Sequence, residues 1–267
     1  MILPASYLNG FAPRDGQPLY PSLWTGCVGS WAPCLGPSGL TLRDWSQSRQ
    51  HGTLTLKAAS DWAVVDGRYA LAFSGSSTSE TTSTQGRVVL TTDLGASSVG
   101  ISCWLKPSTL TKRGICTSGP NQGIPKFAIT LETTGAIIVY RGGNLTSTLT
   151  LTAGKSNHFF VWSDGTNTSI WINGKFSNTS GQGTNHSAQT QFFIGSNYWG
   201  ALDGSITQFD FYNVRPSDAV IQMLSIRPGI AYEMAPRRRS SAQVTVAPLR
   251  YNLFSGSIGN TDVIGAS

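Results

Sequence analysis

Short apolar segments recur about every ten residues between residues 53 and 214, and turn residues separate them. Asp164-Gly165 and Asn173-Gly174 are the clearest turn pairs, because both positions of a two-residue hairpin turn tolerate a positive φ. This spacing favours a sandwich of short antiparallel strands over a helical or α/β fold. The expected strands are 53–56, 69–73, 87–92, 100–106, 125–132, 136–141, 158–163, 168–173, 191–195 and 205–213.

Residues 205–213, SITQFDFYN, show the two-residue period of a β-strand. Thr207, Phe209 and Phe211 share one side, and Gln208, Asp210 and Tyr212 share the other. The pattern predicts one face in the core and one wetter face. The low share of charged residues, 12%, agrees with a turn-rich β protein in which Ser, Thr, Asn and Gly fill the gaps between strands.

One short helix is expected near the end of the strand region, in PSDAVIQMLSI, residues 216–226. Pro216 suits a first helical turn, and Asp218 lies near the positive end of the helix dipole. The apolar stripe consists of Val220, Met223 and Leu224.

The two ends of the chain lack any sustained period. Residues 1–23 are rich in proline and are expected to form an extended arm, so the folded domain is predicted at 24–226. Residues 227–267 are aperiodic but too apolar for a disordered tail, so we expect an extended segment that contacts partner subunits in a homo-oligomer or larger assembly. The expected partner-binding residues are Arg237, Arg238, Arg239, Tyr251 and Phe254.

The formal net charge of +6 is unevenly distributed, and a run of basic residues, PRRRSS, falls in the C-terminal segment. A nucleic-acid-binding protein usually clusters its charge on a folded face with interleaved aromatic residues, so we expect no nucleic-acid partner. The longest apolar runs are too short to span a bilayer, and the first residues lack the features of a secretory signal. We therefore expect no membrane association.

The segment LRDWSQSRQHGTLTL, residues 42–56, places Asp44 seven residues before His51. This pair raises the alternatives of an active site, a metal site and a structural corner. Because no third catalytic partner is near in sequence, we expect Asp44 and Ser46 to hydrogen-bond the amides of their own turn. His51 is expected to be a satisfied corner residue.

Cys27, Cys34, Cys103 and Cys116 have neither CxxC nor zinc-ligand spacing. Cys103 and Cys116 are expected to be small buried hydrophobic residues. The alternative that they face each other across a hairpin, and the disulfide state of all four, stay open.

Several segments together resemble laminin-G-like and concanavalin A-like jelly rolls. These include residues 28–31, Asp44-Trp45-Ser46, His51-Gly52-Thr53-Leu54 and YALAFSG, and the likeness continues through FFIGSNYWGALDGSITQFDFYNVRPSDAVIQML. It covers roughly residues 26–226. The resemblance implies an all-β, two-sheet antiparallel jelly roll with one concave sheet, here with a short C-terminal helix and extended arms.

A narrower resemblance is to proteins encoded by tailed phages and prophages, through LTLRDWS, HGTLTL and RPGIAYEMAPRRRS. It implies a non-enzymatic virion structural protein: a capsid decoration (cement), head-fibre or tail-associated subunit that binds other virion proteins and assembles in the host cytoplasm. The alternative is a carbohydrate-binding adhesion module that attaches to a surface glycan of the host.

Catalysis is not expected. Glucanases related to these jelly rolls need two carboxylates about 5–9.5 Å apart, and they usually carry them as Glu-x-Asp-x-Glu on one strand. No such run occurs here. That Glu132 and Asp210 meet across a sheet is an open alternative, but nothing in the sequence marks them as a pair. The Gly-x-Ser-x-Gly elbow of serine hydrolases is absent as well.

Calcium is a frequent ligand in the family, where a rim Asp and backbone oxygens hold the ion. The resemblance implies acids in the segment that reads FSGSSTSE here, but Ser74 and Thr78 stand at those positions. We expect no cofactor and assign Asp93 and Asp203 to turns, with a calcium ion at either as the open alternative.

Carbohydrate binding is the remaining function that the resemblance implies. Such sites stack an aromatic ring on the apolar face of a sugar and add a few polar partners. The best candidate segment is GSNYWGALDG, with Asn197, Tyr198, Trp199 and Asp203 as the expected site residues. The alternative for Trp199 is a loop aromatic that plugs the edge of the sandwich.

Overall fold

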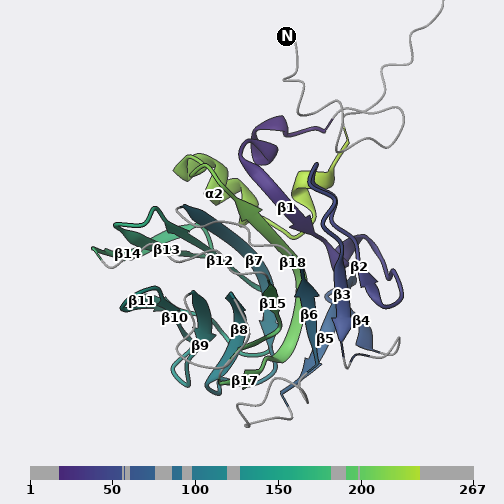
Figure 1. Ribbon diagram of the computed structural model, residues 1–267, viewed down its shortest axis with the longest axis horizontal. Helices are drawn as coiled ribbons and strands as arrows, with labels where there is room; N and C mark the ends of the chain where they lie inside the picture. The colour runs from purple at the N-terminus through teal and green to yellow at the C-terminus, as the bar shows by residue number, and fades with distance from the viewer. Residues whose placement is uncertain are drawn as a thin grey trace, which may run out of the picture. The chain divides into compact units, whose positions relative to one another are not determined.

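The computed structural model describes residues 18–55, 57, 61–75, 86–91, 98–118, 127–181, 191–197 and 199–234. Two eight-stranded antiparallel sheets face each other in this part of the chain (Figure 1). The all-β, two-sheet jelly roll with a single short α-helix that the sequence predicts is therefore confirmed for the described residues. A separate unit, Pro236–Ser267, lies outside the described residues.

The first sheet, sheet I, has the order β14-β13-β12-β7-β18-β5-β4, and β1 pairs with β18 off this path. Its strands are β1 Cys27–Trp31, β4 Trp62–Val65, β5 Arg68–Ser74, β7 Val99–Pro107, β12 Asn157–Ser163, β13 Thr168–Ile172, β14 Lys175–Ser180 and β18 Asp203–Tyr212. β18 and β7 form its centre, because they pair along most of their length.

The second sheet, sheet II, has the order β11-β10-β9-β8-β15-β6-β3-β2. Its strands are β2 Thr41–Leu42, β3 Gly52–Thr55, β6 Arg87–Leu90, β8 Arg113–Ser118, β9 Ala128–Leu131, β10 Ala136–Tyr140, β11 Asn144–Thr150 and β15 Phe192–Ile194. A small ribbon follows β15 and consists of β16 Ser196–Asn197 and β17 Gly200–Ala201. The helical elements are η1 Pro21–Trp24, η2 Pro33–Leu35, α2 Asp218–Leu224 and η5 Ile230–Tyr232.

Most expected strands lie within a few residues of the observed ones, but the expected set omits β2, β4, β8, β11, β14, β16 and β17. β11, NLTSTLT, and β14, KFSNTS, consist mainly of Ser, Thr and Asn, a composition typical of loops. Both are edge strands with largely exposed residues, so they need little apolar surface. Hydrogen bonds from a neighbouring strand, rather than hydrophobic periodicity, hold them in the sheet.

The main core fills the space between the two sheets with aliphatic and phenyl side chains. Phe211 of β18 lies at its centre and makes edge-to-face contacts with Trp31 at 5.6 Å and with Phe192 at 4.8 Å between ring centroids. Thr207, Phe209 and Phe211 are all buried, as expected for the core-facing side of β18.

The other side of β18 is buried too, which corrects the predicted wetter face. A second hydrophobic cluster covers it, and η1, α2 and η5 contribute to that cluster. We call residues 18–24 and 216–234 the terminal cap. Gln208, Asp210 and Tyr212 are each no more than 2% exposed. The sequence pattern of one strand could not show this, because the covering segments come from both ends of the domain.

The terminal cap also corrects the predicted domain boundaries. The backbone of Leu19 donates a hydrogen bond of 2.6 Å to Glu233, and Pro18 pairs with Met234. Leu23 and Tyr232 are buried. Residues 18–23 and 227–234 thus belong to the folded domain, and the limits of 24 and 226 are too narrow.

The helix α2 begins after Ser217, whose hydroxyl accepts a hydrogen bond from the amide of Val220. Pro216 therefore precedes the cap residue rather than lying within the first turn. Ile221 and Leu224 are the buried residues, whereas Val220 and Met223 are partly buried. The predicted stripe is thus rotated, because the helix contacts the cap cluster through Ile221.

The corner at residues 44–51 is structural, as predicted. Asp44 Oδ1 accepts hydrogen bonds from the amides of Ser30 (2.9 Å) and Ser46 (2.8 Å), and Oδ2 accepts one from the amide of Gln50 (2.7 Å). His51 Nδ1 accepts a hydrogen bond of 3.1 Å from the Asp44 amide. These bonds attach the corner to β1.

The four cysteines are free. Cys103 and Cys116 are both buried in the core, as expected. The alternative of a shared hairpin is wrong, because Cys103 lies on β7 of sheet I and Cys116 on β8 of sheet II. Cys27 and Cys34 pack against the terminal cap.

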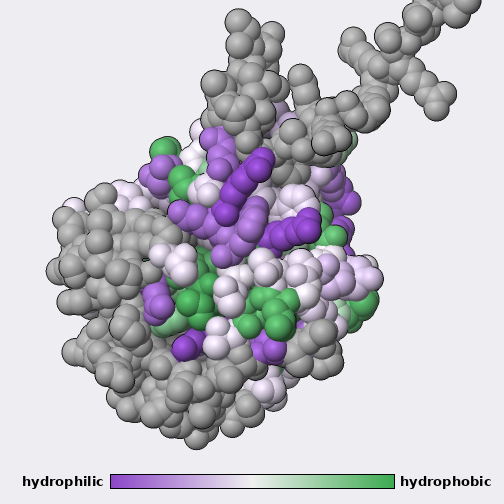
Figure 2. All heavy atoms as spheres, turned by 45° about the vertical axis from the view of Figure 1, so that its right-hand side comes forward, coloured by the Kyte–Doolittle hydropathy of each residue, from purple (hydrophilic) through white to green (hydrophobic). Residues whose placement is uncertain are grey.

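Side-chain hydrogen bonds join the two sheets at both lateral edges. Asn178 of β14 donates to the carbonyl of Thr146 in β11 at 2.7 Å. At the other edge, the indole of Trp62 in β4 donates to the carbonyl of Gly39, which precedes β2, at 2.8 Å. Figure 2 brings this second edge forward, and hydrophobic side chains gather near the middle of the face.

Candidate functional site

The ribbon β16–β17 extends β15 along β8 at one end of sheet II. The amide of Gly195 continues the pairing with a 2.7 Å hydrogen bond to the carbonyl of Ile115. Asn197 then pairs with Gly200, so a two-residue turn separates them. Gly200 has a φ of 99°, a conformation that favours glycine. The ribbon thereby places Trp199 beside the ends of the central strands of sheet II.

Trp199 is half-buried and stacks on Tyr140, with 4.3 Å between ring centroids and 25° between ring planes. Lys112 Nζ lies 5.1 Å from the Trp199 ring centroid and 3.2 Å from Glu132 Oε1. We call Lys112, Glu132, Tyr140 and Trp199 the rim cluster. Lys112 precedes β8 and Glu132 follows β9, at the same end of that strand pair. Tyr140 is the last residue of β10 and pairs with Ala128 at the other end of β9, and Trp199 comes from the ribbon.

The charges of the rim cluster are complementary. Partial burial tends to lower the pKa of Lys112, but the hydrogen bond to Glu132 and the charges beside it raise this pKa above its ordinary value. Burial raises the pKa of Tyr140. The cluster therefore places the Lys112 amino group and the Tyr140 phenol beside the Glu132 carboxyl group and a pair of aromatic rings.

Asp203, the first residue of β18, forms hydrogen bonds with the turn that follows β7. Its Oδ2 accepts a 2.6 Å hydrogen bond from Thr109, and its carbonyl accepts one of 2.9 Å from the Ser108 amide. Across the described ranges, no group of three or more His, Cys, Asp or Glu residues is placed to hold a metal ion. The turn role expected for Asp203 accounts for these contacts.

Seven of the predicted site residues lie outside the described residues, and nothing tests them: Asp93, Tyr198, Arg237, Arg238, Arg239, Tyr251 and Phe254. Asn197 lies in β16, where its backbone pairs with Gly200.

Sequence reasoning found Trp199 but missed Lys112, Glu132 and Tyr140. These residues lie 59 to 87 positions before Trp199, and no local motif links them to it. The sequence leaves open whether Glu132 and Asp210 meet across a sheet, and the structure places them in different sheets. Glu132 follows β9 in sheet II, whereas Asp210 is buried in sheet I under the terminal cap.

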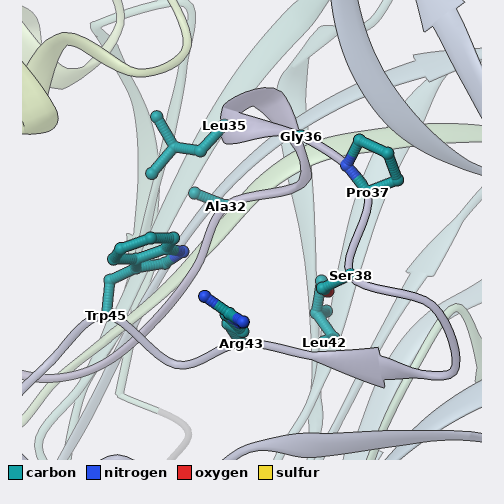
Figure 3. Close-up of a pocket in the computed structure, with 8 residues that line it drawn as sticks. All are labelled: Ala32, Leu35, Gly36, Pro37, Ser38, Leu42, Arg43 and Trp45. Carbon is teal, nitrogen blue, oxygen red and sulfur yellow. The ribbon is translucent and has the colours of Figure 1, made fainter.

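A pocket lies on another part of the domain, between η2 and the turn that follows β2 (Figure 3). Its volume is about 200 Å³. Its lining residues are Ala32, Leu35, Gly36, Pro37, Ser38, Leu42, Arg43 and Trp45. The guanidinium of Arg43 and the ring of Trp45 are turned toward the same space (Figure 3).

Comparison with known families identifies most of the jelly roll. Residues 74–222 match the Laminin_G_3 family, which is described as the concanavalin A-like lectin/glucanases superfamily. No curated protein matches the chain. The matched range includes the whole rim cluster and none of the residues that line the pocket of Figure 3.

Solved structures share the fold at low sequence identity. Trypanosoma rangeli sialidase, solved with 2,3-difluorosialic acid, is 14% identical with a TM-score of 0.57; the match covers 78% of this chain and 34% of the sialidase chain. Domain 4 of AbnA, an extracellular GH43 arabinanase from Geobacillus stearothermophilus, was solved with arabinotriose. It is 18% identical with a TM-score of 0.55, and the match covers 74% of this chain and 98% of that domain.

A third match is the binding domain of Paraclostridial Mosquitocidal Protein 1, at 13% identity and a TM-score of 0.55, covering 76% of this chain and 52% of that one. The chain thus spans about a third of the sialidase and about half of the mosquitocidal binding domain. Among the described residues, no helix has the length and apolar character needed to cross a membrane.

Proposed function

Because this chain belongs to the concanavalin A-like lectin/glucanases superfamily, we propose that its jelly roll binds carbohydrate without cleaving it. The observation that carries the proposal is the rim cluster, in which an aromatic pair lies beside a cation and a carboxylate. The match to domain 4 of AbnA supports it, since that domain is covered almost completely and was solved with arabinotriose.

The chemistry of the rim cluster suits a sugar. The apolar face of a pyranose or furanose ring packs on indole or phenol rings, while its hydroxyl groups need nearby donors and acceptors. Lys112 and Glu132 supply charged partners of both signs beside Tyr140 and Trp199. A neutral sugar, which carries hydroxyl donors and acceptors in equal measure, fits this balance.

The carboxylates of the described strands support binding rather than hydrolysis. Glycosidases need a pair of carboxyl groups on either side of the scissile bond. At the rim, Glu132 forms an ion pair with Lys112, and Asp203 is hydrogen-bonded to Thr109. Asp210 is 2% exposed and lies beneath the terminal cap.

An oligosaccharide array tests this proposal, with arabino-oligosaccharides and bacterial surface glycans as probes. We expect the full chain to bind one class of neutral glycan and Trp199→Ala or Tyr140→Ala to weaken binding at least about tenfold, because each removes a stacking ring. Tyr69→Ala is the matched control, since Tyr69 is a 44% exposed aromatic on β5 of sheet I. Binding to no glycan, or equal binding by all three variants, would contradict the proposal.

A role in a virion is a second candidate, favoured by the apolar, aperiodic sequence after Met234. In this role, the C-terminal segment binds neighbouring virion subunits, and the jelly roll is displayed on a capsid, head fibre or tail assembled in the host cytoplasm. We expect the full chain to oligomerise and residues 18–234 alone to stay monomeric in light scattering. A full-length monomer whose C-terminal segment is cleaved readily by protease would argue against this role.

A further inference from the structure

The pocket of Figure 3 is built by one continuous stretch, residues 32–45, that folds back on itself. The amides of Leu35 and Gly36 bond the carbonyls of Ala32 and Pro33, which forms the turn of η2. Gly36 has a φ of 125°, which favours glycine and redirects the chain toward β2. The amide of Trp45 donates a 2.7 Å hydrogen bond to the carbonyl of Ser30, so the far wall is attached to β1. The pocket is thus preformed.

Two hydrogen-bond donors of the pocket have no protein acceptor within the described ranges. They are the guanidinium of Arg43 and the indole N–H of Trp45, and Figure 3 shows both on the sides that face the pocket. Asp44, next to Arg43 in the chain, does not neutralise it in an ion pair. Its carboxylate instead accepts hydrogen bonds from the amides of the corner, including those of Ser46 and Gln50.

The remaining walls are mainly apolar. Ala32 and Leu42 are buried at 3% exposure, whereas Leu35 is 44% exposed at the mouth. An edge-to-face contact with Tyr232, at 6.4 Å and 74°, supports the Trp45 ring from the side of the terminal cap. The pocket therefore combines an aromatic wall, the Trp45 ring, with the guanidinium of Arg43. Arg43 is exposed to solvent and forms no ion pair within the described residues.

The pocket is small. Its volume of about 200 Å³ lies below the ~300–1,000 Å³ of typical sites for drug-sized ligands. It can hold one ring with its substituents rather than an oligomer. Guanidinium groups bind carboxylates in a bidentate manner, and an indole packs on the apolar face of a sugar ring.

We propose that the Arg43–Trp45 pocket binds a monosaccharide that carries a carboxylate, such as a terminal uronic acid. The carboxylate pairs with Arg43, and the ring lies between Trp45 and Leu35. This inference goes beyond the proposed function, because the pocket lies outside the family-matched residues and shares no residue with the rim cluster. The pocket and the rim cluster would then bind sugars of different charge at separate places on the domain.

Nuclear magnetic resonance titration of the full chain tests this inference, with methyl glucuronide and its neutral analogue methyl glucoside as probes. We expect shifts of the Trp45 indole resonance on adding the glucuronide, and binding of the glucoside at least about tenfold weaker. Arg43→Gln should weaken glucuronide binding by at least the same factor. Arg43→Lys should give an intermediate affinity, because it keeps the charge and loses the planar fork.

The matched control is Lys175→Gln, which removes one exposed positive charge from β14, at the opposite edge of sheet I from β4. It should leave glucuronide binding unchanged. Equal affinity for the two sugars, or unchanged glucuronide binding in Arg43→Gln, would overturn the inference. Tighter binding of a peptide with a free C-terminal carboxylate would do so as well, since the pocket would then be a peptide site. Loss of binding in Trp199→Ala with retention in Arg43→Gln would assign the acidic sugar to the rim cluster and leave the proposed function standing.

Discussion

Asp210 carries a carboxyl group into the packed layer between sheet I and the terminal cap. It accepts hydrogen bonds from the hydroxyl of Ser30 and, at 2.7 Å, from the amide of Gln208. Ser30 also bonds the hydroxyl of Tyr232, and the Gln208 carbonyl oxygen accepts the amide of Gly229 at 2.7 Å. Burial raises the pKa of Asp210 from 3.8 to about 7. One acid thus links the centre of sheet I to the C-terminal part of the cap.

The raised pKa predicts a specific pH dependence. The folded state favours the neutral form of the Asp210 carboxyl group. Its contribution to the free energy of unfolding is therefore complete below about pH 4 and is lost as the pH rises through about 7. One pKa unit corresponds to about 1.4 kcal/mol, so the loss amounts to several kcal/mol. His158, whose pKa burial lowers to about 3, acts in the opposite direction between pH 3 and 6.5. Because the two effects oppose each other, we expect the unfolding free energy of the wild type to change little between about pH 4 and pH 6.5.

Chemical denaturation of the wild type and Asp210→Asn at several pH values separates the two effects. The difference in unfolding free energy should shift in favour of the variant by several kcal/mol between pH 4 and pH 8, because His158 is common to both proteins. A difference that stays constant across this range would show that Asp210 titrates normally.

At the level of elements, the sequence predicts strands well where both a hydrophobic period and turn residues are present, as in β12 and β13. It fails for β11 and β14, which are polar edge strands held by their neighbours. It also misjudges the terminal cap, because η1 and η5 are too short to have a period. The corner at Asp44 was predictable from the sequence, because its hydrogen-bond partners Ser46 and Gln50 lie only a few residues further along the chain.

Two leucines of the N-terminal segment test whether the terminal cap is part of the domain. Leu23 is 1% exposed and Leu19 is 39% exposed. Leu23→Ala should lower the unfolding free energy by about 2–5 kcal/mol, the usual cost of deleting a buried leucine. Leu19→Ala should cost well under half of that. Similar small effects in denaturant titrations would indicate that residues 18–24 form an independent arm, as the sequence alone suggests.

At the level of the whole chain, the family assignment rests on residues 74–222. The two binding sites that we propose, the rim cluster and the Arg43–Trp45 pocket, share no residue. The rim cluster draws on four separated segments, so the sequence predicts its tryptophan and not its partners. The pocket is continuous in sequence, but its empty space depends on how η2 turns. Neither a cavity nor a stacked ring pair has a sequence signature.

A crystal structure of the full chain with the tightest neutral glycan from the array tests the central claim most directly. We expect one sugar ring against the Tyr140–Trp199 pair, with its hydroxyl groups in hydrogen-bond reach of Lys112 and Glu132. A glycan bound elsewhere on the domain, with this ring pair free of sugar, would contradict the claim.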